Sequence, residues 1–164
     1  MGDLMLRLSI PLLLVSIGVS LLASSAGCSS PRLKTPNSFV ELEDPGYGNL
    51  TYKAISSDGA MLVVRWEDDQ PKGDVNFWTE ALTRELTGGR GYELLETVEL
   101  RSSLGGGKLV HLRGTLGDEV YRYDVAIFVH GDDEVVTVEA AAPEAQYEGY
   151  SKPFSDAIES LYFD

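Results

Sequence analysis

The sequence has few of the residues that most often carry catalytic or redox chemistry. Its 164 residues include one cysteine and two histidines. A single cysteine cannot form an internal disulfide, so a packed apolar core has to hold the fold together. Neither histidine has a second histidine or a cysteine at the spacing of a zinc site. We therefore expect no metal and no cofactor.

Positive charge is also scarce. The chain contains 13 lysines and arginines but 26 aspartates and glutamates, which gives a formal net charge of -13 at pH 7. Such an acidic chain repels the phosphate backbone of nucleic acids and the headgroups of anionic lipids. The composition predicts a well-solvated protein with no nucleic-acid partner.

Long hydrophobic runs are absent except for one short stretch near the amino terminus. Residues 9–23 are rich in Leu, Ile and Val, but this stretch is shorter than the ~20 apolar residues that a membrane-spanning helix needs. Arg7 precedes the stretch, and small residues follow it at 24–27. This order is typical of a signal peptide, which we place at residues 1–27.

The residues Ser25-Ala26-Gly27-Cys28 resemble the lipobox of bacterial lipoproteins, although a serine stands where a leucine is usual. The resemblance implies cleavage before Cys28, a thioether-linked diacylglycerol on its thiol and acylation of its new amino group. Cys28 is thus the expected lipid attachment site, and membrane lipid is the first expected partner. An ordinary secretory signal with an incidental cysteine and an uncleaved membrane anchor remain as alternatives.

The residues after Cys28 predict both a linker and a location. Residues 28–37 are polar and contain Pro31 and Pro36, which is typical of a tether. Ser29 and Ser30 resemble the residues that follow the cysteine in lipoproteins moved to an outer membrane. We therefore expect a lipid-anchored protein of the bacterial cell envelope, on the outer membrane and facing the periplasm.

Residues 38–164 carry the periodicity of a single α+β domain. Apolar residues alternate with polar ones in the strand candidates, and they recur at intervals of three and four in the helix candidates. Strands are expected at 39–42, 50–56, 60–66, 93–101, 109–116, 120–130 and 135–141, and helices at 73–87 and from Pro143 onward with a break at Pro153. The glycines at 105–107 predict a hairpin loop, since no Gly-Lys-Ser/Thr sequence accompanies them.

The last helix carries a stripe of large apolar residues that follows an apolar strand and a proline. The stripe comprises Tyr147, Tyr150, Phe154, Ile158 and Leu161. This pattern resembles the end of PsbP-like and DcrB-like domains. The resemblance implies an antiparallel sheet of about six to seven strands covered by helices, a fold found in exported lipoproteins and photosynthetic extrinsic subunits. Fold analogy transfers no activity.

Candidate catalytic groups are few. His111 and His130 lie in predicted strands, and the fold can bring either of them near Asp124 or Glu139. No nucleophile motif is present, which favours a non-catalytic domain that binds an envelope protein or a small ligand or has a structural role. The alternative is an envelope hydrolase that uses a histidine and a carboxylate. A structure in which both histidines meet an acidic residue in one pocket would favour that alternative.

Overall fold

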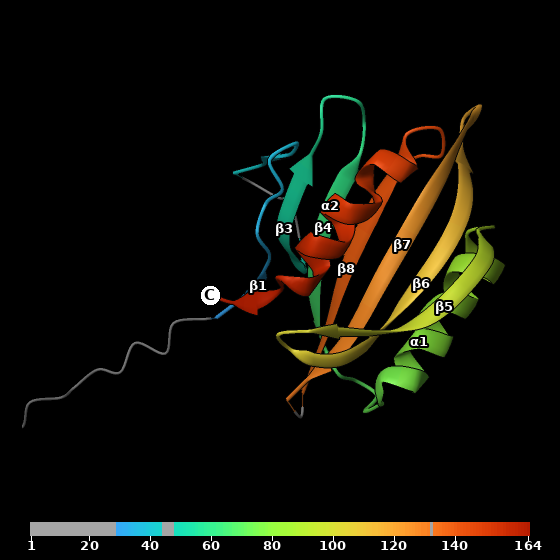
Figure 1. The fold of residues 1–164 in the computed structure, drawn as a ribbon. Coiled ribbons are helices and arrows are strands. Elements are labelled where there is room, and N and C mark those ends of the chain that lie inside the picture. The colour runs from blue at the N-terminus through green and yellow to red at the C-terminus, as the bar shows by residue number, and fades with distance from the viewer. Residues whose placement is uncertain (1–28, 44–47, 132) are drawn as a thin grey trace, which may run out of the picture.

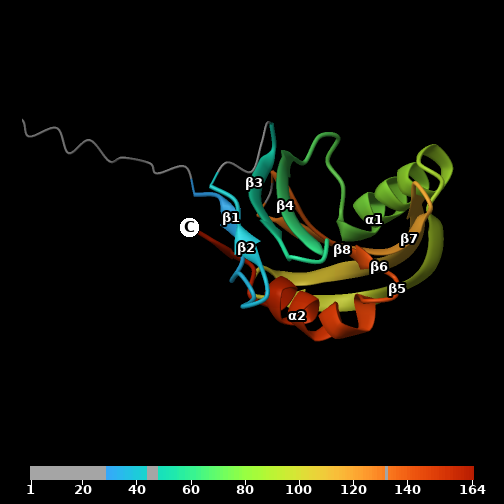
Figure 2. The same ribbon diagram turned by 90° about the horizontal axis from the view of Figure 1, so that it is seen from above.

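An antiparallel sheet of seven strands forms the centre of the computed structural model, which describes residues 29–43, 48–131 and 133–164. The strand order is β2-β3-β4-β8-β7-β6-β5, and a separate pair of strands joins the two ends of the described chain. Helices α1 and α2 lie on opposite faces of the sheet (Figures 1 and 2). The expected α+β class and antiparallel sheet covered by helices are confirmed.

Most bounds of the elements in the large sheet lie near the predicted ones. The strands are β1 (Pro31–Arg32), β2 (Val40–Glu41), β3 (Leu50–Ile55), β4 (Met61–Asp68), β5 (Glu93–Ser102), β6 (Gly105–Leu116), β7 (Glu119–His130), β8 (Glu134–Pro143) and β9 (Tyr162–Phe163). The helices are α1 (Val75–Arg84), which continues into a π-helical turn at Glu85–Gly89, and α2 (Tyr147–Glu159).

Alternation along the central strands divides the core into two layers. In β7, Val125 and Ile127 belong to the cluster under α1, whereas Ala126 and Phe128 belong to the cluster under α2. Successive strand residues point to opposite faces, so one strand contributes to both layers. The α2 side is the larger core and includes Phe154 and Ile158 from the helix itself.

Helix α1 begins and ends as its sequence indicates. The Asp74 side chain accepts a hydrogen bond from the Phe77 amide and caps the first turn. The apolar stripe of Val75, Trp78 and Leu82 packs on the sheet. Gly89 closes the π-helical turn that follows.

The start and the continuity of α2 were predicted wrongly. Strand β8 extends to Pro143, and the helix begins four residues later, at Tyr147. Pro153 lies inside the helix and does not divide it. The buried side chains of Phe154 and Ala157 hold the residues after the proline against the sheet, which compensates for the hydrogen bond that proline cannot donate.

The predicted tether also differs from the structure. Cys28 and the signal peptide at 1–27 lie outside the described residues, but most of 28–37 packs on the domain. Strand β1 pairs with β9, and Ser30 and Asp164 exchange two backbone hydrogen bonds of 3.0 and 3.1 Å. Leu33 is only 3% exposed within the α2-side core. Burial of this one apolar side chain favours the docked conformation that the polar composition alone does not predict.

The glycines at 105–107 form the first residues of β6, whereas a loop was predicted there. The turn before them is limited to Ser103 and Leu104. Gly107 lies opposite Leu100 in the β5–β6 ladder and is buried.

Candidate ligand-binding site

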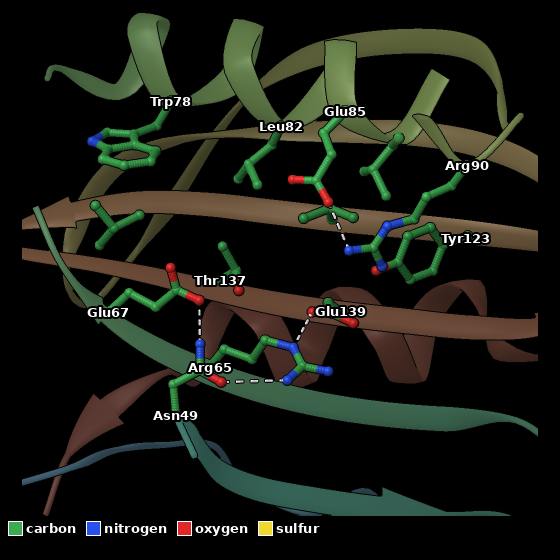
Figure 3. A pocket seen from close by; sticks show the side chains of 13 residues that line it. Asn49, Arg65, Glu67, Trp78, Leu82, Glu85, Arg90, Tyr123, Thr137 and Glu139 are labelled. Carbon is green, nitrogen blue, oxygen red and sulfur yellow. Dashed lines mark hydrogen bonds and ion pairs between the residues drawn. The ribbon is translucent and has the colours of Figure 1, made fainter. Parts of the chain in front are cut away.

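A pocket of about 390 Å³ lies between α1 and the sheet. Figure 3 shows its two walls, one made by α1 and the π-helical turn and the other by the sheet. It is lined by Asn49, Arg65, Glu67, Trp78, Leu82, Glu85, Leu86, Arg90, Tyr123, Val125, Val135, Thr137 and Glu139. The volume is in the range of small-molecule sites.

The helix side of the pocket is largely apolar. Trp78, Leu82 and Leu86 come from α1 and its extension, and they pack against the α1-side core. The Trp78 indole nitrogen donates a 2.6 Å hydrogen bond to Asp69 Oδ1, and the same oxygen accepts a hydrogen bond from the Gly73 amide. Asp69 is 3% exposed, so these bonds fix the indole in place.

The sheet side carries an ion pair. Arg65 Nε on β4 donates to Glu139 Oε1 on β8 at 2.6 Å, and Arg65 Nη1 lies 3.4 Å from Asn49 Oδ1. The two ionic residues are diagonal neighbours across the β4–β8 ladder. The Glu139 side chain is 16% exposed. Removal of Arg65 would leave this carboxylate mostly buried and without a counter-ion.

Tyr123 and Arg90 complete the far end of the pocket. Burial raises the pKa of the Tyr123 hydroxyl well above its ordinary value, and nearby Glu139 adds to the shift. This hydroxyl therefore stays protonated at neutral pH and is a poor nucleophile. Arg90 pairs with Glu85 at 2.7 Å at the more exposed rim.

The two histidines do not share a site. His111 on β6 faces Asp124 on β7, and the distance from His111 Nδ1 to Asp124 Oδ1 is 2.7 Å. His130 stacks on Phe163 with ring centroids 4.5 Å apart. Asp124 and His130 are six positions apart along β7, about 20 Å at ~3.3 Å per strand residue. The arrangement that would favour the hydrolase alternative, with both histidines at one acidic residue, is therefore not formed.

The His111–Asp124 pair lies under the start of α2, away from the pocket. The Tyr147 hydroxyl donates to Asp124 Oδ2, and the Arg122 guanidinium carbon lies 4.5 Å from the centre of the Tyr147 ring. The Asp124 side chain is 4% exposed. These contacts join α2 to β6 and β7. Glu139, the other carboxylate considered, lies on the opposite face with Arg65.

Stability is expected to depend on pH through His111. The hydrogen bond to Asp124 raises the pKa of His111 above its ordinary value, against the opposing effect of burial. The folded state thus holds the proton more tightly than the unfolded state does. The pair stabilises the fold fully below pH about 6.5, and this contribution is lost as the pH rises through the raised pKa.

Urea unfolding of the wild type and of His111→Gln, at pH 6 and at pH 9, measures this effect. The wild type should lose more stability than the variant between the two pH values. An equal loss in both proteins would show that His111 does not contribute.

Two further features, a metal-binding cluster and a membrane-spanning helix, are absent from the part of the chain that the structure describes. Histidine, cysteine, aspartate and glutamate side chains form no group of three or more that can hold a metal ion among residues 29–43, 48–131 and 133–164. Within the same ranges, no helix has the length and apolar character needed to span a membrane.

Comparison with solved structures identifies the fold class. LpqN of Mycobacterium tuberculosis, a protein involved in cell envelope biogenesis, matches with a TM-score of 0.64 and 10% identity over 86% of this chain and 87% of its own. Cyanobacterial PsbP from Synechocystis sp. PCC 6803 matches with a TM-score of 0.57 and 12% identity over 85% and 96%. The domain therefore has a PsbP-like α+β fold.

The same fold occurs in a protein of different function. The Ran-binding protein Mog1p of Saccharomyces cerevisiae matches with a TM-score of 0.56 and 11% identity over 81% of this chain and 89% of its own. No protein-family profile and no curated protein matches the sequence. At these identities the likeness is one of fold, and function has to be argued from the site.

Sequence reasoning did not find the pocket. Of the lining residues, the sequence singled out only Glu139, as a carboxylate that the fold could bring near a histidine. A usable signal was nevertheless present, because Arg65 and Glu139 interrupt strands that are otherwise largely apolar. Charged residues in the middle of such strands indicate a polar site on one face.

Proposed function

We propose that this chain is a lipid-anchored protein of the bacterial envelope whose domain binds a ligand in the pocket beside α1 without catalysing a reaction. The pocket carries this proposal, because it combines an apolar wall with a few fixed polar groups. Its size suits a small molecule or a single side chain of a partner protein.

The envelope location is supported by the leader and the lipobox-like residues before Cys28. Structural similarity to LpqN, which is involved in cell envelope biogenesis, is consistent with this location. Several acyl chains on Cys28 give stable anchoring, since each buried methylene contributes ~0.8 kcal/mol.

The non-catalytic role is supported by the pairing of the polar groups in the pocket. Both arginines are already bound to glutamates, and the Tyr123 hydroxyl has a raised pKa. The histidine–carboxylate pair, which a hydrolase needs at its substrate, contacts α2 and does not line this pocket.

Native mass spectrometry of the mature chain, released from the envelope in mild detergent, tests the proposal. The wild type should carry a bound species that Leu82→Trp, which fills the pocket, has lost. Ala81→Trp is the matched control, because Ala81 is exposed on the same helix and does not line the pocket. Identical spectra for all three proteins would contradict the proposal.

A further inference from the structure

The acidic groups of the pocket are not fully neutralised. Glu139 pairs with Arg65, and Glu85 pairs with Arg90. Glu67, the third glutamate of the lining, accepts a hydrogen bond from the neutral amide of Asn49. Three carboxylates and two guanidiniums leave the lining with one negative charge, on a protein whose formal net charge is -13.

The charge faces an apolar and aromatic surface. In Figure 3, Glu67 extends from the sheet wall and Glu85 from the opposite wall, and both carboxylates point into the gap, with Trp78 at the Glu67 end. Aromatic faces attract cations, and the hydrogen bond from the Trp78 indole to the Asp69 carboxylate adds to the negative potential there.

An anionic ligand fits this arrangement poorly. To reach the Arg65 guanidinium it would have to compete with Glu139, whose side chain is 16% exposed. Separation of that pair would leave a mostly buried carboxylate without its counter-ion. A cation needs no such separation, because within residues 29–43, 48–131 and 133–164 the hydrogen bond that Glu67 accepts comes from a neutral amide and not from a cation.

From this charge complementarity we propose that the pocket binds a small organic cation, an ammonium group carried on an apolar body. The ammonium group lies between Glu67 and the Trp78 ring, and the apolar body contacts Leu82 and Val135. This inference rests on the proposed function, because it names the ligand class of the same pocket.

Tryptophan fluorescence measures binding of small probes in the pocket directly. The protein has two tryptophans, and Trp66 packs against the core on the α2 side, so a Trp66→Phe background leaves Trp78 as the reporter. The probes are 2-phenylethylammonium, its neutral analogue 2-phenylethanol and the anion 3-phenylpropionate. The ammonium probe should give a saturable change at concentrations at least about tenfold lower than the other two, as expected for one charge-assisted hydrogen bond.

Two charge variants test whether Glu67 determines the affinity for the ammonium probe. Glu67→Gln should weaken binding of the ammonium probe about tenfold, because it removes one charged acceptor. Glu80→Gln makes the same change in net charge on the exposed side of α1, where Glu80 pairs with Arg84, and it should leave the affinity unchanged. Equal losses in both variants would indicate a non-specific charge effect and overturn the assignment to the pocket.

The remaining outcomes separate this inference from the proposed function. Preferential binding of 3-phenylpropionate, lost in Leu82→Trp, would overturn the cationic ligand and retain the pocket as a binding site. Absence of binding by all three probes would overturn the cationic ligand, whereas the proposed function would still be decided by the species that native mass spectrometry finds on the wild type and not on Leu82→Trp.

Discussion

Phe154→Ala is expected to lower the free energy of unfolding by about 3–5 kcal/mol, the cost of a large cavity in a packed core. Phe154 is 2% exposed, and its ring lies 5.7 Å from the Tyr150 ring and 6.0 Å from the Phe39 ring. One side chain thus joins α2 to the segment that precedes β2. Its loss affects the whole α2-side layer.

Urea unfolding followed by circular dichroism measures this change. Phe77→Ala is the matched control, since Phe77 is 44% exposed on α1, and we expect it to cost below about 1 kcal/mol. Similar losses for the two variants would show that the α2-side layer is not the main core.

Gly107→Val is expected to destabilise the fold by on the order of 3 kcal/mol through overpacking. A Cβ atom at this position would lie 2.5 Å from the Phe128 ring and 2.6 Å from the Ile127 carbonyl oxygen. Phe128 is fully buried, and the carbonyl belongs to the neighbouring strand, so neither can move away easily. The glycine is therefore required for close packing.

Gly106→Val, at the residue before Gly107, is the control variant. A Cβ atom at Gly106 meets nothing within 4 Å, and valine favours strands, so stability should be unchanged or slightly increased. Thermal unfolding of the two variants distinguishes them. A loss at both positions would favour a requirement for a flexible glycine loop over a packing requirement at Gly107 alone.

The parts of the fold that were predicted correctly are those with a strong local pattern. Alternation along β7 and the three-to-four spacing of Trp78, Leu82 and Leu86 extend over many residues, and each position supports the next. The antiparallel sheet and the two helices follow from such patterns. The resemblance to PsbP-like domains is confirmed at the level of fold.

The errors occurred where a distant contact decides the local conformation. Leu33 lies in a polar segment, and only its burial in the α2-side core places it in the domain. Pro153 predicts a break in isolation, but the packing of Phe154 keeps α2 continuous. Local sequence cannot show these long-range contacts.

The pocket was not predicted because its residues come from separate parts of the sequence. Arg65 and Glu139 are 74 positions apart and meet only through the β4–β8 pairing. Likewise, the contact between His111 and Asp124 depends on the register of β6 and β7. Once the register is known, both contacts follow from the two-residue period of strands.

Intact-mass spectrometry of the full chain, expressed in a Gram-negative bacterium, tests whether the domain is anchored in the envelope through Cys28. We predict a membrane-fraction protein that has lost residues 1–27 and carries diacylglycerol and acyl groups on Cys28, whereas Cys28→Ala should be unacylated and leave the membrane fraction. A wild-type chain with an unmodified Cys28 in the soluble fraction would contradict the lipid anchor.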